Sequence, residues 1–307
     1  MRVIATSTLP IDLPALLPGA EVDVPESWIG IARCDLSEAD ALVCLLLDRI
    51  DETVIARAPK LRVIANCAAG YDNIDLAAAT AAGIAVTNTP DVLTEATAEL
   101  AFALLLAAAR RLPEAAALIR SRAWPGWRLD QLLGVELTGK TLGVIGLGRI
   151  GKAMVRRGEA FGMRAISAGR TGGMTIDELF SEADVISLHC PLTPETHHLV
   201  NARRLALMKP TAILVNTSRG GCVDEAALIE ALHAGRIFAA ALDVFEREPE
   251  LQDALYDCPR LVLAPHLGSA TTETRIAMAR LCAAAVIEVL AGRRPPNLVN
   301  TTVRIRG

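Results

Sequence analysis

The segment from residue 141 to residue 151 constrains the fold more than any other part of the chain. Its first five residues, Thr141–Ile145, are mostly apolar or β-branched, which predicts a buried parallel strand. Gly146, Gly148 and Gly151 follow in the spacing G-x-G-x-x-G. The first glycine permits the tight turn, the second lets the backbone approach a pyrophosphate, and the third lets the next helix pack on the sheet. The helix expected over 149–161 would point its N-terminal amides at that anion. The segment predicts a dinucleotide site; a glycine-rich turn without a ligand is the alternative.

Composition limits the class of protein. The 307 residues suffice for two domains, and a hydrophobic content of 52% suits large cores, although alanine-rich stretches such as 96–109 inflate that value. No apolar run spans a membrane without a polar residue, and the start, MRVIAT, is too short and too polar for a signal peptide. A net charge of −4 argues against nucleic-acid binding. Seven scattered cysteines with no C-x-x-C predict a reducing, cytoplasmic setting.

Strands and helices alternate along the first 95 residues. Short strands are expected at 2–5, 21–24, 41–47, 61–67 and 84–87. Helical patterns lie between several of them, for example at 52–58 and 76–82. This alternation with short connections predicts a parallel sheet covered by helices.

A long apolar helical pattern follows over 96–121, with a break or kink expected near Pro113. It is apolar nearly all round up to residue 109, so it should be buried on more than one side. The loop after it carries Trp124 and Trp127. These tryptophans either anchor the loop at the surface or contact a partner subunit or the substrate.

A second series of strands and helices runs from residue 141 to about 285. Its strands are expected at 141–145, 164–167, 184–189, 212–216, 237–243 and 261–264. Six strands is the number in a full dinucleotide-binding sheet. A long helix is expected over Thr272–Leu290, followed by a proline-rich stop and a short tail that returns to the first unit.

Three stretches after the fingerprint each follow a predicted strand and carry one chemically active side chain. They contain Arg219, Glu248 and His266. Ligands gather at the carboxyl edge of open α/β sheets, so these side chains are expected on one rim. Arg219 would neutralise an anionic substrate and polarise its carbonyl, and His266 would protonate the carbonyl oxygen as hydride arrives. Glu248, if it holds the imidazole, would favour its charged form. The set predicts hydride transfer to a 2-oxo acid.

Each of these residues also has a structural interpretation. Arg219 could simply pair with a carboxylate, Glu248 could be surface charge, and His266 could be a satisfied structural histidine. Their occurrence together behind a dinucleotide fingerprint favours catalysis. The other histidines, His189, His197, His198 and His233, are expected to be structural or solvated. Cys67, Cys190 and Cys222 are expected to be small buried hydrophobes near the site.

The sequence resembles the D-isomer-specific 2-hydroxyacid dehydrogenase family. The matching stretches are residues 70–75, 139–151, 216–221, 242–249 and 265–270. Within the family, residues 87–107 and 268–271 are most similar to glyoxylate and hydroxypyruvate reductases. The resemblance implies an α/β fold of two Rossmann-like or flavodoxin-like parallel-sheet domains with a cleft between them. It also implies a discontinuous substrate domain, 1–95 plus 286–307, and a dinucleotide-binding domain, 96–285.

The resemblance implies roles for individual residues. Arg219, Glu248 and His266 become the catalytic trio. The backbone amides of Ala68, Ala69 and Gly70 would cradle the substrate carboxylate as an anion nest, beside Arg219 and His266. Ala69 departs from the valine usual there, which leaves that loop slightly roomier. Family members are typically homodimers, and no metal site is expected.

The cofactor site is implied in the same way. Asp243 would lie near the nicotinamide carboxamide, and Thr94 near the nicotinamide end. The full set of cofactor-binding residues would be Leu147, Gly148, Arg149, Ile150, Gly169, Arg170, Thr171, Thr94, Cys190, Pro191, Thr217, Ser218, Asp243, His266 and Gly268.

The choice between NAD and NADP depends on the residue after the second strand of this domain. An NAD-specific site places an acid there to hold the ribose 2′-hydroxyl. The expected position is Gly169, followed by Arg170 and Thr171, with no acid. Arg170 and Thr171 could bind a 2′-phosphate, so NADP(H) is preferred while NAD(H) stays open. The link over 170–175 is shorter than in relatives, which leaves the adenine side of the pocket less defined.

Three functions compete. The first is reduction of glyoxylate, hydroxypyruvate or a similar small 2-oxo acid to a D-2-hydroxy acid. The second is D-3-phosphoglycerate dehydrogenase, which would need basic residues near the substrate loop; residues 66–75 supply none, and no appended regulatory domain is expected in 307 residues. The third is a non-catalytic, dinucleotide-sensing binding protein of the same family. Formate dehydrogenase is disfavoured because that chemistry has no carbonyl to protonate.

Overall fold

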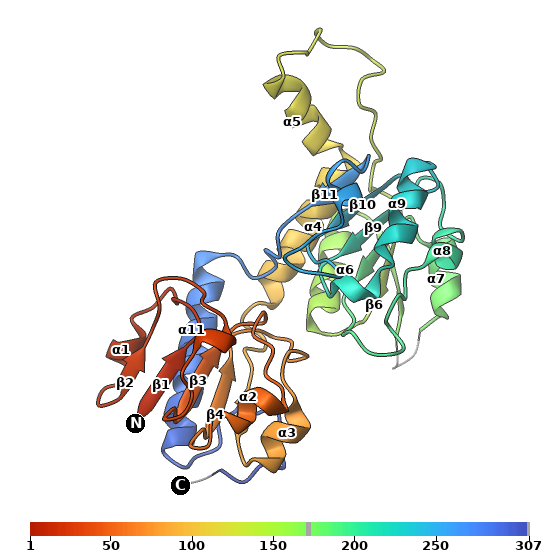
Figure 1. The fold of residues 1–307 in the computed structure, drawn as a ribbon. Coiled ribbons are helices and arrows are strands. Elements are labelled where there is room, and N and C mark those ends of the chain that lie inside the picture. The colour runs from red at the N-terminus through yellow and green to blue at the C-terminus, as the bar shows by residue number, and fades with distance from the viewer. Residues whose placement is uncertain (170–172, 306–307) are drawn as a thin grey trace. The chain divides into compact units, whose positions relative to one another are not determined.

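All the strands among the described residues, 1–169 and 173–305, lie in two parallel sheets in this computed structural model (Figure 1). The chain divides into two compact units. Unit 1 consists of Met1–Leu93 and Ser269–Gly307, and unit 2 of Thr94–Gly268. Each unit contains one of the sheets, which confirms the predicted α/β class with two parallel-sheet domains.

Unit 1 contains the five-stranded sheet, in the order β2-β1-β3-β4-β5. Its strands are β1 (Arg2–Ala5), β2 (Glu21–Asp23), β3 (Ala41–Cys44), β4 (Val63–Asn66) and β5 (Ala85–Thr87). Its helices are α1 (Leu13–Leu16), η1 (Ile31–Arg33), α2 (Glu52–Ala56), α3 (Leu76–Ala81) and α11 (Thr272–Leu290). Alternate strand residues face opposite sides, so Leu42 packs with the α2 side chain of Ile55 while Val43 packs with the α11 side chain of Val286.

Unit 2 contains the six-stranded sheet, in the order β11-β10-β9-β8-β6-β7. Its strands are β6 (Thr141–Ile145), β7 (Arg164–Ala168), β8 (Val185–Leu188), β9 (Ile213–Asn216), β10 (Ala239–Leu242) and β11 (Leu261–Leu263). The carboxyl ends of these parallel strands meet at one edge, which is where the predicted site residues occur.

Helices cover both faces of this sheet. The helices of unit 2 are α4 (Thr94–Ala109), α5 (Leu112–Arg120), α6 (Arg149–Ala160), α7 (Ile176–Glu182), α8 (Ala202–Leu205), η2 (Gly220–Cys222), α9 (Glu225–His233) and α10 (Asp253–Tyr256), and all but α5 lie against the rest of the unit. Val215 of β9 packs with Leu105 of α4 and Met154 of α6. Its neighbour Leu214 packs on the other face with Leu228 of α9. Because both faces are covered, the inner strands β6, β8, β9 and β10 are buried along their whole length and mostly apolar.

The apolar pattern expected over 96–121 forms two helices rather than one kinked helix. Arg111 has a left-handed backbone, with φ of 53°, and ends the continuity of α4 just before α5. Pro113 lies in the first turn of α5, where a missing N–H costs little. No residue of α5 is buried, and α5 with the segment after it extends away from the six-stranded sheet (Figure 1).

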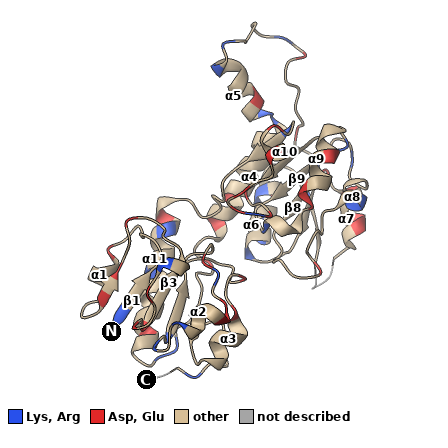
Figure 2. Cartoon of the chain, viewed as in Figure 1, with Lys and Arg blue, Asp and Glu red and all other residues tan. Residues whose placement is uncertain are grey.

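The second domain boundary differs from the one expected at 285. Residues 269–285 belong to unit 1, because Cys282 and Ala283 of α11 pack with Val63 of β4 in the same core as Val286. All the predicted strands are confirmed, with ends shifted by a few residues at most. Figure 2 shows Lys and Arg interspersed with Asp and Glu along the helices and loops of both units. Across the described chain, no helix combines the length and apolar character needed to cross a membrane.

Candidate active site

In the glycine turn after β6, packing requires two of the three glycines, whereas the third leaves open space. Gly146 has φ of 95°, and a Cβ there would lie 2.7 Å from the backbone of His189 and Cys190. A Cβ on Gly151 would lie 2.2 Å from the Gly146 carbonyl oxygen. A Cβ on Gly148 would meet no atom within 4 Å. Packing therefore explains Gly146 and Gly151, whereas Gly148 leaves open space where a ligand can approach the backbone.

This space fits the pyrophosphate of a dinucleotide. Gly148 caps the N-terminus of α6 without a side-chain hydrogen bond, and the first turn of α6 contains no acidic residue. The helix dipole and its N–H groups therefore favour an anion there. The strand order reverses between β6 and β8, and ligands bind at such a point in open α/β sheets.

Two buried polar atoms beside the turn also suit a ligand. Among the described residues, His189 Nδ1 after β8 and Thr217 Oγ1 after β9 have no hydrogen-bond partner. Burial lowers the pKa of His189 to about 4, so the ring is neutral, and its Nε2 lies 2.8 Å from Ser187 Oγ. A bound dinucleotide could supply the partners that these atoms lack in the protein.

Glu248 and His266 form an acid–base pair at the carboxyl edge of β10 and β11. Glu248 Oε2 lies 2.7 Å from His266 Nδ1, and Glu248 Oε1 accepts the Phe245 N–H at 2.9 Å. Burial alone would raise the pKa of Glu248, but the hydrogen bond and charge of His266, helped by Phe245 N–H and Arg219, outweigh it and lower that pKa. Within the described residues, His266 Nε2 has no hydrogen-bond partner, so this atom is available to a substrate.

Asp243 holds the turn that carries His266. Its Oδ1 accepts the Leu267 N–H at 2.6 Å, its Oδ2 accepts the Gly268 N–H at 2.9 Å, and its carbonyl accepts the His266 N–H at 2.9 Å. His266 itself has a left-handed backbone, with φ of 54°, which these bonds stabilise. Burial outweighs the bonds to Asp243 and raises its pKa to about 6.

Arg219 lies in a loop that packs directly on the Glu248 loop. The buried Asn216 side chain donates to the Arg219 carbonyl at 2.9 Å and accepts the Ser218 N–H at 3.0 Å. A Cβ on Gly220 would lie 1.8 Å from the carbonyl carbon of Phe245, so only glycine permits this approach. The structure thus brings Arg219, Glu248 and His266 to one edge, as the sequence predicted.

The remaining predicted cofactor residues of unit 2 also lie at this edge. Leu147, Arg149 and Ile150 lie in the glycine turn and the start of α6, Cys190 and Pro191 after β8, Thr217 and Ser218 after β9, Gly268 after β11, Gly169 after β7, and Thr94 at the start of α4. A Cβ on Gly268 would lie 3.3 Å from Cγ2 of Thr97, so the first turn of α4 adjoins the histidine turn.

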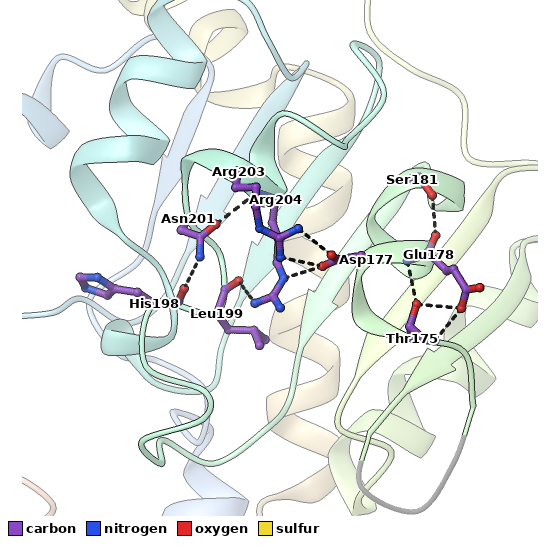
Figure 3. Close-up of polar contacts among 9 residues, drawn as sticks. All are labelled: Thr175, Asp177, Glu178, Ser181, His198, Leu199, Asn201, Arg203 and Arg204. Carbon is purple, nitrogen blue, oxygen red and sulfur yellow. Dashed lines mark hydrogen bonds and ion pairs between the residues drawn. The ribbon is translucent and has the colours of Figure 1, made fainter.

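Arg170 and Thr171, the predicted 2′-phosphate ligands, lie outside the described residues. The chain that resumes after them is firmly held at the start of α7 (Figure 3). The side chain of Thr175 accepts the Glu178 N–H, and Asp177 pairs with Arg203 and Arg204. These two guanidinium groups lower the pKa of Asp177 to about 2.

The predicted carboxylate loop of unit 1 has bound carbonyls and two unbound amides. The Ala68 N–H, predicted as a third donor to the substrate, instead donates to the Asn66 carbonyl at 2.8 Å. Gly70 O accepts Asn66 Nδ2 at 2.8 Å, Ala69 O accepts Asn88 Nδ2 at 2.7 Å, and Ala68 O accepts the Thr89 N–H at 2.8 Å. In contrast, the N–H groups of Ala69 and Gly70 donate to no described residue. This arrangement leaves two donors for an anion.

Sequence analysis missed the side chains that hold these loops. Asn66 and Asn88 bind the carboxylate loop, Asn73 bonds to the side chain of Asn66, and Glu225 binds the loop of Glu248. Asn73 lies inside a stretch that resembles the family, which was its only signal. All seven cysteines are free, and all but Cys67 are buried. The described residues contain no group of His, Cys, Asp or Glu arranged to hold a metal ion.

Comparisons with known proteins identify the family of the chain. The family model "D-isomer specific 2-hydroxyacid dehydrogenase, NAD binding domain" matches residues 102–268. The glyoxylate reductase of Thermococcus litoralis is 50% identical over 289 residues, covering 89% of this chain and 87% of that protein. The crystal structure of TT0316 protein from Thermus thermophilus is 47% identical with a TM-score of 0.91, covering 97% of this chain and 100% of that one. An NADPH-dependent glyoxylate/hydroxypyruvate reductase from Sinorhizobium meliloti, solved with NADP and malonate, is 34% identical with a TM-score of 0.89, covering 100% and 99%.

Proposed function

Because the chain belongs to the D-isomer-specific 2-hydroxyacid dehydrogenase family, we propose that it reduces a small 2-oxo acid to the D-2-hydroxy acid with NAD(P)H. Glyoxylate and hydroxypyruvate are the proposed substrates, because the relatives described above carry those names. The observation that carries the proposal is the 2.7 Å contact between Glu248 and His266 at the carboxyl edge of a dinucleotide-type sheet.

The catalytic roles follow from the chemistry of each side chain. The reduced nicotinamide, when bound, supplies the hydride. His266 would give the proton on Nε2 to the carbonyl oxygen, while Nδ1 stays bonded to Glu248 and keeps the ring oriented. Arg219 would bind the substrate carboxylate and polarise the carbonyl through its planar guanidinium. In the reverse direction His266 would accept the proton from the hydroxyl group.

Unit 2 would bind the cofactor, and unit 1 would bind the carboxylate of the substrate. Unit 2 would hold the dinucleotide over Gly148, with the polar atoms of His189 and Thr217 among its partners. Unit 1 would bind the substrate carboxylate through the N–H groups of Ala69 and Gly70.

NADP(H) is the proposed cofactor. Gly169, where an NAD-specific enzyme has an acid, has open space at its Cβ position, and Arg170 follows it. The S. meliloti relative is NADPH-dependent by name and was solved with NADP. Arg170→Ala should raise the Kd for NADPH about tenfold and leave that for NADH unchanged. Equal effects on the two cofactors would contradict the assignment.

A homodimer is proposed, with α5 and residues 121–136 as the contact. No residue of α5 is buried, and Trp127 and Leu129 are 80% and 82% exposed. Apolar side chains exposed in one segment mark protein interfaces. Replacing both Trp127 and Leu129 by serine should convert the dimer to a monomer in sedimentation velocity; a monomeric unmodified protein would overturn this proposal. The free cysteines fit a cytoplasmic, reducing compartment.

Initial rates test the function directly. Glyoxylate, hydroxypyruvate and 3-phosphohydroxypyruvate would each be supplied with NADPH and with NADH, and nicotinamide absorbance followed. Fast turnover of either small 2-oxo acid is expected, with NADPH ahead. Preference for the phosphorylated substrate would favour a 3-phosphoglycerate dehydrogenase. NADPH binding without turnover of a broad 2-oxo acid panel would favour a non-catalytic, dinucleotide-sensing protein.

A further inference from the structure

Glu225, the first residue of α9, is a buried carboxylate that the proposed chemistry does not use. It is 2% exposed, its Oε1 accepts the Glu246 N–H at 2.8 Å, and its Oε2 accepts Gln252 Nε2 at 3.0 Å. Burial and the charge of Glu246 raise its pKa, since the bonds to Glu246 and Gln252 offset them only in part. A group that is costly to bury is retained here between α9 and the loop over 243–252.

The contact is reciprocal. Glu246 Oε1 accepts the Glu225 N–H at 3.2 Å and lies 3.1 Å from His198 Nε2. The His198 ring stacks on His197 with centroids 4.1 Å apart, and the His198 carbonyl accepts Asn201 Nδ2 at 3.1 Å (Figure 3). We call Glu225, Glu246, Gln252 and His198 the Glu225 latch. It joins α9, the Glu248 loop and the segment before α8.

The Glu225 latch acts on the backbone next to the catalytic pair. The Glu246 N–H bonds to Glu225, and the neighbouring Phe245 N–H bonds to Glu248 Oε1 at 2.9 Å. The Phe245 carbonyl packs on Gly220, next to Arg219. Any shift of residues 245–246 therefore moves the Glu248 carboxylate relative to His266 and disturbs the Arg219 loop.

We propose that Glu225 is a positioning residue, which fixes the 243–252 loop through the latch so that Glu248 holds His266 in its catalytic orientation. The proposal rests on the proposed function. Glu225 acts as a hydrogen-bond acceptor rather than as a charge, because both partners are neutral donors. Glu225 is not among the groups that shift the pKa of Asp243 or of Glu248, whereas His266 acts on both and Arg219 acts on Glu248.

Glu225→Ala and Glu225→Gln separate positioning from charge. Glu225→Ala leaves the Glu246 N–H without its acceptor, so kcat should fall roughly 10- to 10²-fold while the KM for NADPH stays unchanged. The pH profile of kcat should also change, because a displaced Glu248 no longer holds the His266 ring through Nδ1. Glu225→Gln keeps an oxygen for Glu246 N–H, and the Gln252 amide can turn to accept from it. This variant should recover most of the activity and the original pH profile.

Asp184→Ala is the matched control. Asp184 precedes β8 at the opposite, amino edge of the same sheet, where it accepts the Thr141 N–H at 2.9 Å and Lys209 Nζ at 3.0 Å. Its loss removes one bond to a backbone N–H, as in Glu225→Ala, and one ion pair to Lys209. It should therefore lower the unfolding midpoint as Glu225→Ala does without changing kcat or the pH profile. Equal stability loss in both variants with unchanged kcat and pH profile in Glu225→Ala would overturn the proposal.

A second measurement does not depend on turnover. In protein labelled with ¹⁵N-histidine, the His266 signal is identified by its absence in His266→Ala, and its ring nitrogen chemical shifts are recorded at one pH. In Glu225→Ala these chemical shifts should change, because the hydrogen bond between Nδ1 and Glu248 is disturbed; unchanged chemical shifts would overturn the proposal even if the reductase activity itself proved absent. If Glu225→Ala does not fold, Glu246→Ala, at a partly exposed position, should give a smaller shift in the same direction.

Discussion

Both parallel sheets have a buried aspartate at their carboxyl edge, but the two aspartates have different roles. In unit 1, Asp48 is 1% exposed and follows β3. It accepts the hydroxyl of Thr6, the indole N–H of Trp28, and the N–H groups of Ile31 and Leu45. In unit 2, Asp243 is also 1% exposed, and it follows β10.

The difference lies in what the donors belong to. The four donors on Asp48 come from segments of unit 1 that follow or precede its strands, so these hydrogen bonds only hold those segments together. The donors on Asp243 come from the turn of His266, whose Nδ1 is bonded to Glu248 and whose Nε2 points to no partner in the described chain. The same kind of sheet edge thus stabilises loops in one unit and presents an acid in the other, because function depends on the residues placed on a fold.

His266→Ala tests the functional edge with the largest expected effect. Loss of the proton donor should lower kcat by at least about 10²-fold while NADPH still binds, as seen by nicotinamide fluorescence. The control is His233→Ala, at an exposed position in the last turn of α9, which should keep normal kcat. Near-normal turnover in His266→Ala would end its role as the acid.

Asp48→Asn tests the structural edge. In asparagine one carboxylate oxygen is replaced by an amide nitrogen, which cannot accept a hydrogen bond. If that is Oδ1, Trp28 and Ile31, which share it, would both lose their acceptor. The free energy of unfolding should fall by about 3 kcal/mol in urea titrations. The folded fraction should retain the wild-type response of kcat to pH. A pH response altered as in Glu225→Ala would remove the distinction between the two edges.

Asp243→Asn should change how stability depends on pH. The pKa of Asp243 is raised to about 6 in the folded protein, above the unfolded value of about 3.9, so the native state binds more protons between these values. The stabilisation that Asp243 gives the folded protein is therefore lost as pH rises from about 4 to 6, by up to about 3 kcal/mol. Glu248, with its lowered pKa, works in the opposite direction, so the variant is compared with wild type at each pH. The stability of Asp243→Asn relative to wild type should rise with pH; a constant difference would contradict the assignment.

The two edges also differ in how far sequence could predict them. Most strands were predictable because both faces of each sheet are covered, which makes the inner strands short apolar runs bounded by turns. Arg219, Glu248 and His266 were predictable because parallel topology brings strand ends together. The supporting side chains were not, since Glu225 and Asn66 act through tertiary contacts that no local pattern records. The same reason explains α11, whose apolar face did not reveal that it packs on β4 of unit 1.

Arg219→Lys asks whether the functional edge needs a planar guanidinium. A lysine keeps the charge but cannot form two parallel bonds to a carboxylate, so kcat/KM for glyoxylate should fall about 30-fold with little change in the Kd for NADPH. Arg203→Lys is the control, because Arg203 forms a two-bond pair with Asp177 on α7 (Figure 3). Loss of activity in both variants alike would point to a general effect of removing guanidinium groups.

Gly148→Ala has the smallest expected effect, and it distinguishes a loss of ligand affinity from a loss of fold stability. A Cβ at position 148 meets nothing within 4 Å in the protein, and the backbone there, with φ of −76°, suits alanine. Stability should therefore be unchanged, while the Kd for NADPH should rise about tenfold because the Cβ occupies the space expected for the pyrophosphate. Gly151→Ala is the contrast, since its Cβ would lie 2.2 Å from the Gly146 carbonyl oxygen and should destabilise the fold itself. Wild-type affinity in Gly148→Ala would mean that the dinucleotide does not approach this turn. The edge of unit 2 would then resemble that of unit 1, with glycines and acids that serve packing alone.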